Sequence, residues 1–129
     1  MPGATPRLGG GGFMGGQEGC VFCMIASGKL KADVVLEDGD VIAFRDIAPK
    51  APVHVVVASK GHVRDLSGLD GGDGRLLLSI MGAVARVAES EGLREGGYRV
   101  VTNCGRDAGQ SVPHLHFHVL GGGTLGDIA

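Results

Sequence analysis

The sequence predicts one α+β domain built on a mainly antiparallel sheet of five strands, with one long helix and one short helix. One long segment, residues 75–91, has apolar residues at the three- and four-residue spacing of an amphipathic helix. The β-branched and apolar runs occur in sequential groups and do not alternate with helices. Strands that follow one another directly favour antiparallel pairing, because parallel strands need long crossover connections.

The N-terminal half is expected to contain the short helix and the first three strands. The apolar segment Val21–Ser27 ends at Gly28, a residue that can close a helix in the left-handed conformation. Asp38-Gly39 separates the runs Val34–Glu37 and Val41–Arg45, which predicts a hairpin. After a proline-containing loop, the β-branched run Val53–Ala58 predicts an interior strand.

The C-terminal half is expected to contain the long helix and two further strands. The helix covers Arg75–Glu91, with Asp73 as a possible N-cap and Gly92 at its end. Its apolar face is formed by Leu77, Ile80, Met81, Val84, Val87 and Ala88. Strands are predicted over Tyr98–Asn103 and His114–Leu120.

Length and composition limit the organisation of the chain. The 129 residues suffice for one domain, which we place at residues 20–122 between a flexible Gly-rich N-terminal tail at 1–19 and a C-terminal tail at 123–129. The sequence contains no apolar run long enough to span a bilayer and no signal-peptide core, which favours the cytoplasm. Three cysteines, an odd number, argue against a disulfide framework.

Composition also argues against binding to a nucleic-acid polymer. The net charge of -2 provides no general attraction for DNA or RNA. With four Phe, one Tyr and no Trp, the chain has few side chains for stacking on bases. Any phosphate that the protein binds must therefore be held by local groups.

The most informative segment contains three alternating histidines, His114, His116 and His118. In a strand these side chains share one face, while Leu115, Phe117 and Val119 line the other. Imidazoles contribute less to packing than aliphatic residues, so their alignment indicates chemistry. Two chemistries remain open on these residues alone: metal binding, or attack on phosphorus by one imidazole assisted by its neighbours.

A polar loop leads into the histidine strand. Gly105 and Gly109 allow a tight turn whose backbone N–H groups could converge on an anion, and Asn103 and Ser111 add side-chain donors. A plain surface turn is the alternative, because glycine turns are common. The position directly upstream of three histidines favours the anion-binding interpretation.

The segment from Gly109 to Gly122 resembles the signature of the histidine-triad (HIT) superfamily, with Gly-Gln-Ser upstream of His-x-His-x-His and a Leu-Gly-Gly ending. Phe44–His54 and the following Ser59–His62 are similar to the motif in the first half of that family. The resemblance covers residues 20–122 and is nearest to the nucleotide-binding branch. It implies a HIT-like fold and a homodimer whose two sheets join.

The resemblance also implies roles for individual residues. His116 would be the nucleophile that forms a nucleotidyl-histidine intermediate, with His118 on the phosphate, Ser111 near the leaving group and His114 beside the nucleophile. Asp46 would hold the ribose hydroxyls. The α-phosphate would be cradled by Asn103, Gly109, Gln110, Ser111 and Val112, and the base would lie in an apolar slot of Phe22, Ile25 and Phe44.

Cys20 and Cys23 form a Cys-x-x-Cys pair, a spacing shared by zinc sites and redox pairs. The βαβ pattern expected around a redox pair is absent from the predicted elements. Some bacterial members of the family that this chain resembles carry zinc, and others lack both cysteines. The resemblance therefore implies a structural zinc site formed by Cys20, Cys23, His54 and His114. Two free thiols are the alternative. No function is assigned to Cys104. His62 is either an exposed turn histidine or, as the resemblance allows, a residue near the base or beside another site residue.

These observations predict a hydrolase or nucleotidyl transferase that cleaves a phosphoramidate or phosphoester bond at the α-phosphate of a nucleoside monophosphate derivative. No metal is required for that step. Three alternatives remain: a diadenosine polyphosphate hydrolase, a nucleotide-binding or scaffold protein with residual catalysis, and a zinc hydrolase with an open metal site at the triad.

Overall fold

The computed structural model describes residues 19–128, so the predicted tail at 1–19 lies outside the described residues except for its last position. Two α-helices are present, α1 (Val21–Ala26) and α2 (Gly74–Ser90). The strands are β2 (Val34–Glu37), β3 (Val41–Arg45), β4 (Val53–Ser59), β5 (Tyr98–Val101) and β6 (His116–Gly121). Short 3₁₀ turns lie at Leu66–Gly68, Gly71–Asp73 and Arg106–Ala108. Residues 123–128 form no helix or strand.

The five strands form one sheet in the order β2-β3-β4-β6-β5, and each neighbouring pair is antiparallel. The predicted α+β class, with one long and one short helix, is confirmed. β4 and β6 pair in the middle of the sheet, with Ala58 opposite His116 and Val56 opposite His118. This register places the two histidines on the face of the sheet that also carries the even-numbered residues of β4.

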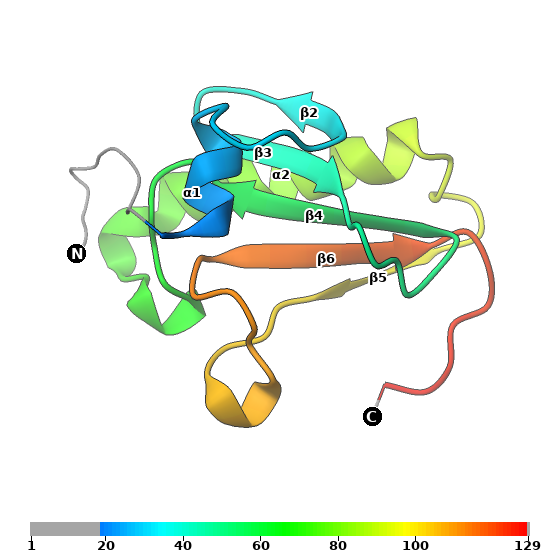
Figure 1. Ribbon diagram of the computed structural model, residues 1–129. Coiled ribbons are helices and arrows are strands. Elements are labelled where there is room, and N and C mark those ends of the chain that lie inside the picture. The colour runs from blue at the N-terminus through cyan, green and yellow to red at the C-terminus, as the bar shows by residue number, and fades with distance from the viewer. Residues whose placement is uncertain (1–18, 129) are drawn as a thin grey trace.

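The helix α2 covers one face of the sheet, behind it in Figure 1. Its buried stripe is Ile80, Ala83, Val84, Val87 and Ala88, packed on apolar side chains of β3, β4 and β6. Leu77 and Met81, predicted for this face, are each 37% exposed and lie at its margin. The stripe that meets the sheet is therefore narrower than the apolar pattern of the sequence.

The opposite face of the sheet carries the short helix α1, in front of the sheet in Figure 1. A second, smaller apolar cluster lies here, with Ile25 of α1 packed on Ile42, Phe44, Val56 and Ala58 of the sheet. Because α1 has only six residues, it covers part of this face. The rest of the face is available for a site.

Some boundaries differ from the sequence prediction. The last strand begins at His116, because the backbone N–H groups of His114 and Leu115 donate to Val112 and Val63 outside the sheet. Asp73 does precede α2, but its side chain makes no capping bond to that helix. It accepts instead from the backbone of Asp70, within the preceding 3₁₀ turn. Across residues 19–128, no helix has the length and apolar character needed to span a bilayer.

The packing of α2 on the sheet generates a stability prediction. Ile80 is fully buried in the larger core, so Ile80→Ala should lower the free energy of unfolding by about 3 kcal/mol through lost apolar contact and the cavity left behind. Glu89→Ala is the matched control, because the Glu89 side chain on the same helix is 70% exposed. The control should change stability by less than about 0.5 kcal/mol in urea denaturation. Equal effects of the two substitutions would contradict this packing.

Candidate functional site

A cavity of about 500 Å³ lies between α1, the loop after β3 and the sheet face that carries His116 and His118. Its wall is mostly apolar, with a few polar groups, which is the usual composition of a small-molecule site. Seven of the ten residues predicted to bind nucleotide line this cavity, together with the predicted nucleophile His116. They are Phe22, Ile25, Phe44, Asp46, Ser111, Val112 and His118.

His116 is held in one orientation by the backbone. Its Nδ1 lies 2.6 Å from the carbonyl oxygen of His114, so Nδ1 carries the proton that is donated to that oxygen. The lone pair of the neutral ring is then on Nε2. Burial lowers the pKa of His116 below its usual value, against an opposing effect of the bond to His114. The ring of Phe22 packs edge-on against the imidazole at a centroid distance of 4.9 Å.

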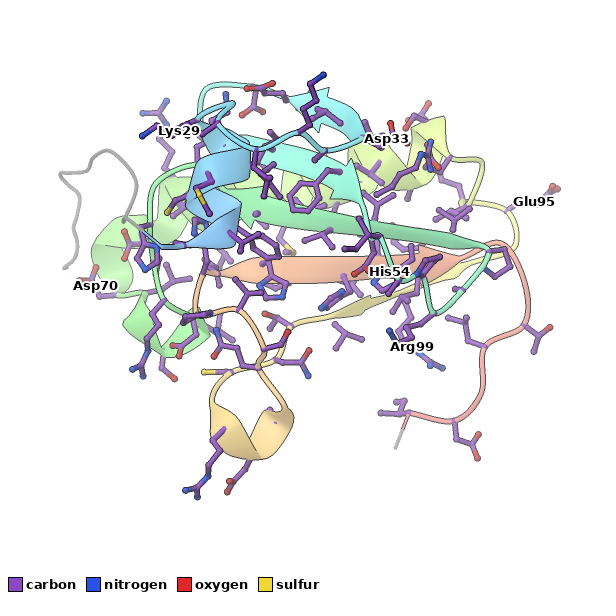
Figure 2. All side chains as sticks on the ribbon, viewed as in Figure 1. Lys29, Asp33, His54, Asp70, Glu95 and Arg99 are labelled. Carbon is purple, nitrogen blue, oxygen red and sulfur yellow. The ribbon has the colours of Figure 1, made fainter. Side chains whose placement is uncertain are left out.

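His118 is also largely neutral at physiological pH. Burial, followed by the nearby imidazoles of His116 and His54, lowers the pKa of His118 to about 4. Its Nδ1 lies 2.8 Å from Nε2 of His54, and Asp46 Oδ2 lies 3.4 Å from the same Nε2 atom. His54, labelled in Figure 2, is the second residue of β4 and lies on the same sheet face. The cavity is thus lined by the neutral imidazoles of His116 and His118, and the ring of His54 contacts that of His118.

The loop before β6 is tied together by Gln110. Its carboxamide oxygen accepts from the backbone N–H of Gly105, and its NH₂ group donates to the carbonyls of Arg64 and Val112. Gly109 has φ of 76°, the left-handed conformation that glycine adopts without strain. Gln110 therefore fixes the loop through its side chain, and Ser111 and Val112 follow it at the cavity wall.

Three residues predicted for the phosphate cradle, Asn103, Gly109 and Gln110, do not line the cavity. The amide of Asn103 donates to the carbonyl of Ala108 and so stays within its own loop. Because these residues stabilise the turn that carries Ser111, their effect on the cavity is indirect.

A second cluster, which we call the Cys/His cluster, consists of Cys20, Cys23, His62 and His114. Nδ1 of His114 lies 3.3 and 3.4 Å from the two sulfurs, and Nδ1 of His62 lies 3.2 Å from Sγ of Cys23. These separations are close to the ~3.5 Å edge of a tetrahedron around zinc with bonds of about 2.0 and 2.3 Å. The cluster could therefore hold a metal ion.

Hydrogen bonding prepares His114 for such a role. Its Nε2 lies 2.6 Å from the carbonyl oxygen of Ser59, so Nε2 donates and Nδ1 presents its lone pair to the sulfurs. Burial lowers the pKa of His114 to about 4, which favours the neutral form that binds metal. The donor set of two sulfurs and two imidazoles fits a closed structural zinc site.

The zinc ligands predicted from the sequence included His54, but the structure brings His62, not His54, to Cys20, Cys23 and His114. His54 lies at the start of β4, opposite Leu120, and its ring meets His118. His62 follows the end of β4, and in an antiparallel pair that end lies beside the start of β6, next to His114. Antiparallel pairing of the two predicted strands was the signal that could have identified His62.

The sequence and the fold both have known relatives. The HIT domain family matches residues 27–125, and the chain belongs to this family. The solved structure described as a HIT family hydrolase from Clostridium thermocellum has 44% sequence identity and a TM-score of 0.84, covering 87% of this chain and 97% of that one. A histidine triad protein from Clostridium difficile has 36% identity and a TM-score of 0.85, covering 88% and 99%.

One relative has an activity in its name. The purine nucleoside phosphoramidase of Escherichia coli (strain K12) is 36% identical over 109 residues, which are 84% of this chain and 92% of that protein. The chain thus has hydrolases of the HIT family among its relatives over nearly its whole described length.

We predict that the hydrogen bonds of the Gln110 side chain make the loop before β6 rigid. Gln110→Ala removes all three, and we expect hydrogen exchange at the Gly105 amide to become about tenfold faster, from the loss of about 1–2 kcal/mol of local stability. Gln110→Glu keeps an acceptor for Gly105 but loses both donors, so it should protect that amide while loosening the contact with Arg64. Unchanged exchange in Gln110→Ala would contradict the role given to this side chain.

Proposed function

We propose that this protein hydrolyses a phosphoramidate or phosphoester bond at the α-phosphate of a nucleoside monophosphate derivative through a covalent intermediate on His116. The observation that carries the proposal is the Nδ1 bond of His116 to the carbonyl of His114, which leaves the Nε2 lone pair for attack in the cavity. The named activity of the Escherichia coli relative supports the same bond type.

The reaction follows from this arrangement in two steps. Nε2 of His116 attacks phosphorus, the P–Nε2 bond forms, and the bond from phosphorus to the leaving nitrogen or oxygen breaks. The leaving group takes a proton from solvent, either directly or through the hydroxyl of Ser111, which takes a proton from solvent in turn. Water then attacks phosphorus, gives its proton to the medium, and displaces the neutral imidazole as the P–Nε2 bond breaks. The backbone carbonyl of His114 stabilises the positive charge that the ring acquires while it is bonded to phosphorus.

The remaining cavity residues suit the other parts of a nucleotide. Phe22, Ile25 and Phe44 supply an apolar wall of the size that a base requires. Asp46 supplies a carboxylate for the ribose hydroxyls, held by a bond from the N–H of Ala48 to Oδ1. Ser111 and the N–H of Val112 supply donors for the phosphate, with Asn103, Gly109 and Gln110 supporting their loop.

Rapid-quench mass spectrometry with adenosine 5′-phosphoramidate tests this function. The wild-type protein should show a transient adduct with the mass of one AMP, whereas His116→Ala should show none and should lose at least about 10³-fold in kcat. Cys104→Ser is the control, because Cys104 contacts Ser67 outside the cavity and its loss should leave the adduct intact. Full turnover by His116→Ala would refute the mechanism.

We also propose that the Cys/His cluster binds structural zinc. Two thiolates and two imidazoles complete the tetrahedron and leave no open position for water, so the metal would hold the chain together and take no part in the reaction. Cys20 and Cys23 come from the start of α1, and His114 precedes β6. Zinc would therefore fasten the N-terminal helix to the residue whose carbonyl orients His116.

Metal content measures this part of the proposal. Purified wild type should contain stoichiometric zinc by elemental mass spectrometry, and Cys23→Ser and His62→Ala should each reduce the zinc content and lower the melting temperature. Cys104→Ser should retain zinc, since Cys104 is outside the cluster. Zinc that is absent from wild type, or undiminished in His62→Ala, would exclude this ligand set.

A homodimer is part of the proposal as well. Tyr98 and Val100 of the edge strand β5 are 40% and 39% exposed, and Leu78 of α2 is 76% exposed. Val100 lies opposite Val119, so its side chain is on the sheet face that α2 only partly covers. An edge strand with exposed apolar side chains suits isologous pairing that joins two sheets, and the exposed Leu78 adds apolar surface on the helix.

A further inference from the structure

We infer that His54 is a positioning residue that keeps the proton of His118 on Nε2, so that His118 presents an N–H donor to the cavity. The inference on the proton position rests on geometry alone. The use of that donor, as a partner of the phosphoryl oxygen, rests on the proposed function. The argument begins at a backbone amide in the loop before β4.

The backbone N–H of Lys50 lies 3.0 Å from Nδ1 of His54 and can only donate. Nδ1 must therefore carry a lone pair, and the proton of the neutral ring is on Nε2. The His54 ring is 6% exposed, so solvent has little access to it. Turning the ring over would place a carbon against the Lys50 amide and lose this bond.

Nε2 of His54 lies 2.8 Å from Nδ1 of His118. Because Nε2 carries the proton, it donates, and Nδ1 of His118 accepts. A neutral His118 then has its own proton on Nε2. The reverse direction would require His54 to have no proton on either nitrogen, since the Lys50 amide already occupies the lone pair of Nδ1.

The carboxylate of Asp46 agrees with this direction. Its Oδ2 lies 3.4 Å from Nε2 of His54, where it faces the same N–H. The set Asp46, His54 and His118 has the composition of a metal site, yet Nε2 of His54 has no lone pair to give to a metal. The three residues are better explained as a hydrogen-bond relay.

The two cavity histidines consequently carry opposite tautomers. His116 has its proton on Nδ1, bound to the carbonyl of His114, and a lone pair on Nε2. His118 has its lone pair on Nδ1, bound to His54, and its proton on Nε2. Two identical side chains on one strand face thus have different roles, His116 as a nucleophile and His118 as a donor. A backbone carbonyl fixes the proton of His116, whereas a backbone amide fixes that of His118 through His54.

Under the proposed function, the different tautomers of His116 and His118 suit different parts of the reaction. When Nε2 of His116 attacks, negative charge grows on the non-bridging oxygens of the phosphoryl group. A donor fixed beside them stabilises that charge, and removal of such a donor typically lowers kcat by about 10²-fold. Without His54, His118 could take the tautomer whose lone pair faces the phosphate.

Long-range ¹H–¹⁵N NMR of the histidine rings, recorded on the protein as purified and without substrate, measures the proton position directly. In the wild type we expect a protonated Nδ1 on His116 and a protonated Nε2 on His118. Protonation of His118 on Nδ1 in the wild type would overturn the inference. This reading needs no turnover and no variant, so it is independent of the proposed function.

His54→Asn and His54→Gln form a matched pair of variants. The Asn oxygen can accept from Lys50, but the shorter side chain cannot reach His118, whereas Gln can accept from Lys50 and donate to His118. We expect mixed tautomers of His118 in His54→Asn, recovery in His54→Gln, and no change at His116 in either. An unchanged His118 in a folded His54→Asn protein would contradict the relay.

Kinetics with adenosine 5′-phosphoramidate completes the test. His54→Asn should lower kcat by about 10²-fold with KM changed less than about threefold, and His54→Gln should recover most of kcat. Full kcat in His54→Asn would overturn the role of the donor. A wild type that has the expected tautomers but forms no adduct would refute the proposed function and leave the proton assignment standing.

Discussion

The antiparallel pairing of β4 with β6 is the interaction on which the rest of the structure depends. Six residue pairs, from Val53 with Gly121 to Ala58 with His116, join the two strands in the middle of the sheet. Because side chains alternate along each strand, this one register sends apolar residues to α2 on one face and imidazoles to the other. A shift by one residue would bury the histidines against the long helix and remove the site.

The same pairing explains how similar side chains acquire different chemistry. All five histidines of the chain lie along β4, β6 and the segments that adjoin them. His62 and His114 belong to the Cys/His cluster, whereas His116 and His118 line the cavity and His54 contacts His118. Burial lowers the pKa of each imidazole, so the rings are neutral and each has one donor and one acceptor nitrogen. Backbone groups then decide which nitrogen has the proton, as the carbonyls of Ser59 and His114 and the amide of Lys50 do here.

His114 connects the two clusters. Its ring faces the two cysteines, and its carbonyl accepts from the ring of His116 in the cavity. A metal held by the first cluster would therefore restrict the residue that orients the second. The short helix α1 also contributes to both places, since Cys23 belongs to the Cys/His cluster and Phe22 packs on His116 at the cavity.

The sequence by itself determined the fold class, the number of strands and α-helices, and their bounds to within about two residues, because periodicity and turn residues are local properties. It also predicted that His116 and His118 share one face, because alternating residues of a strand point to the same side of the sheet. The loop before β6 was also predicted as one unit, because its glycines and polar residues are close together in the sequence.

Only the tertiary structure decided which histidine meets which partner. His54 was expected beside the cysteines, yet β4 runs antiparallel to β6, so its start faces His118 and the segment after its end brings His62 to His114. The side chain of Gln110 likewise supports its loop from behind, a role set by the distant carbonyl of Arg64. Such contacts depend on register between segments far apart in the chain, which local sequence patterns do not encode.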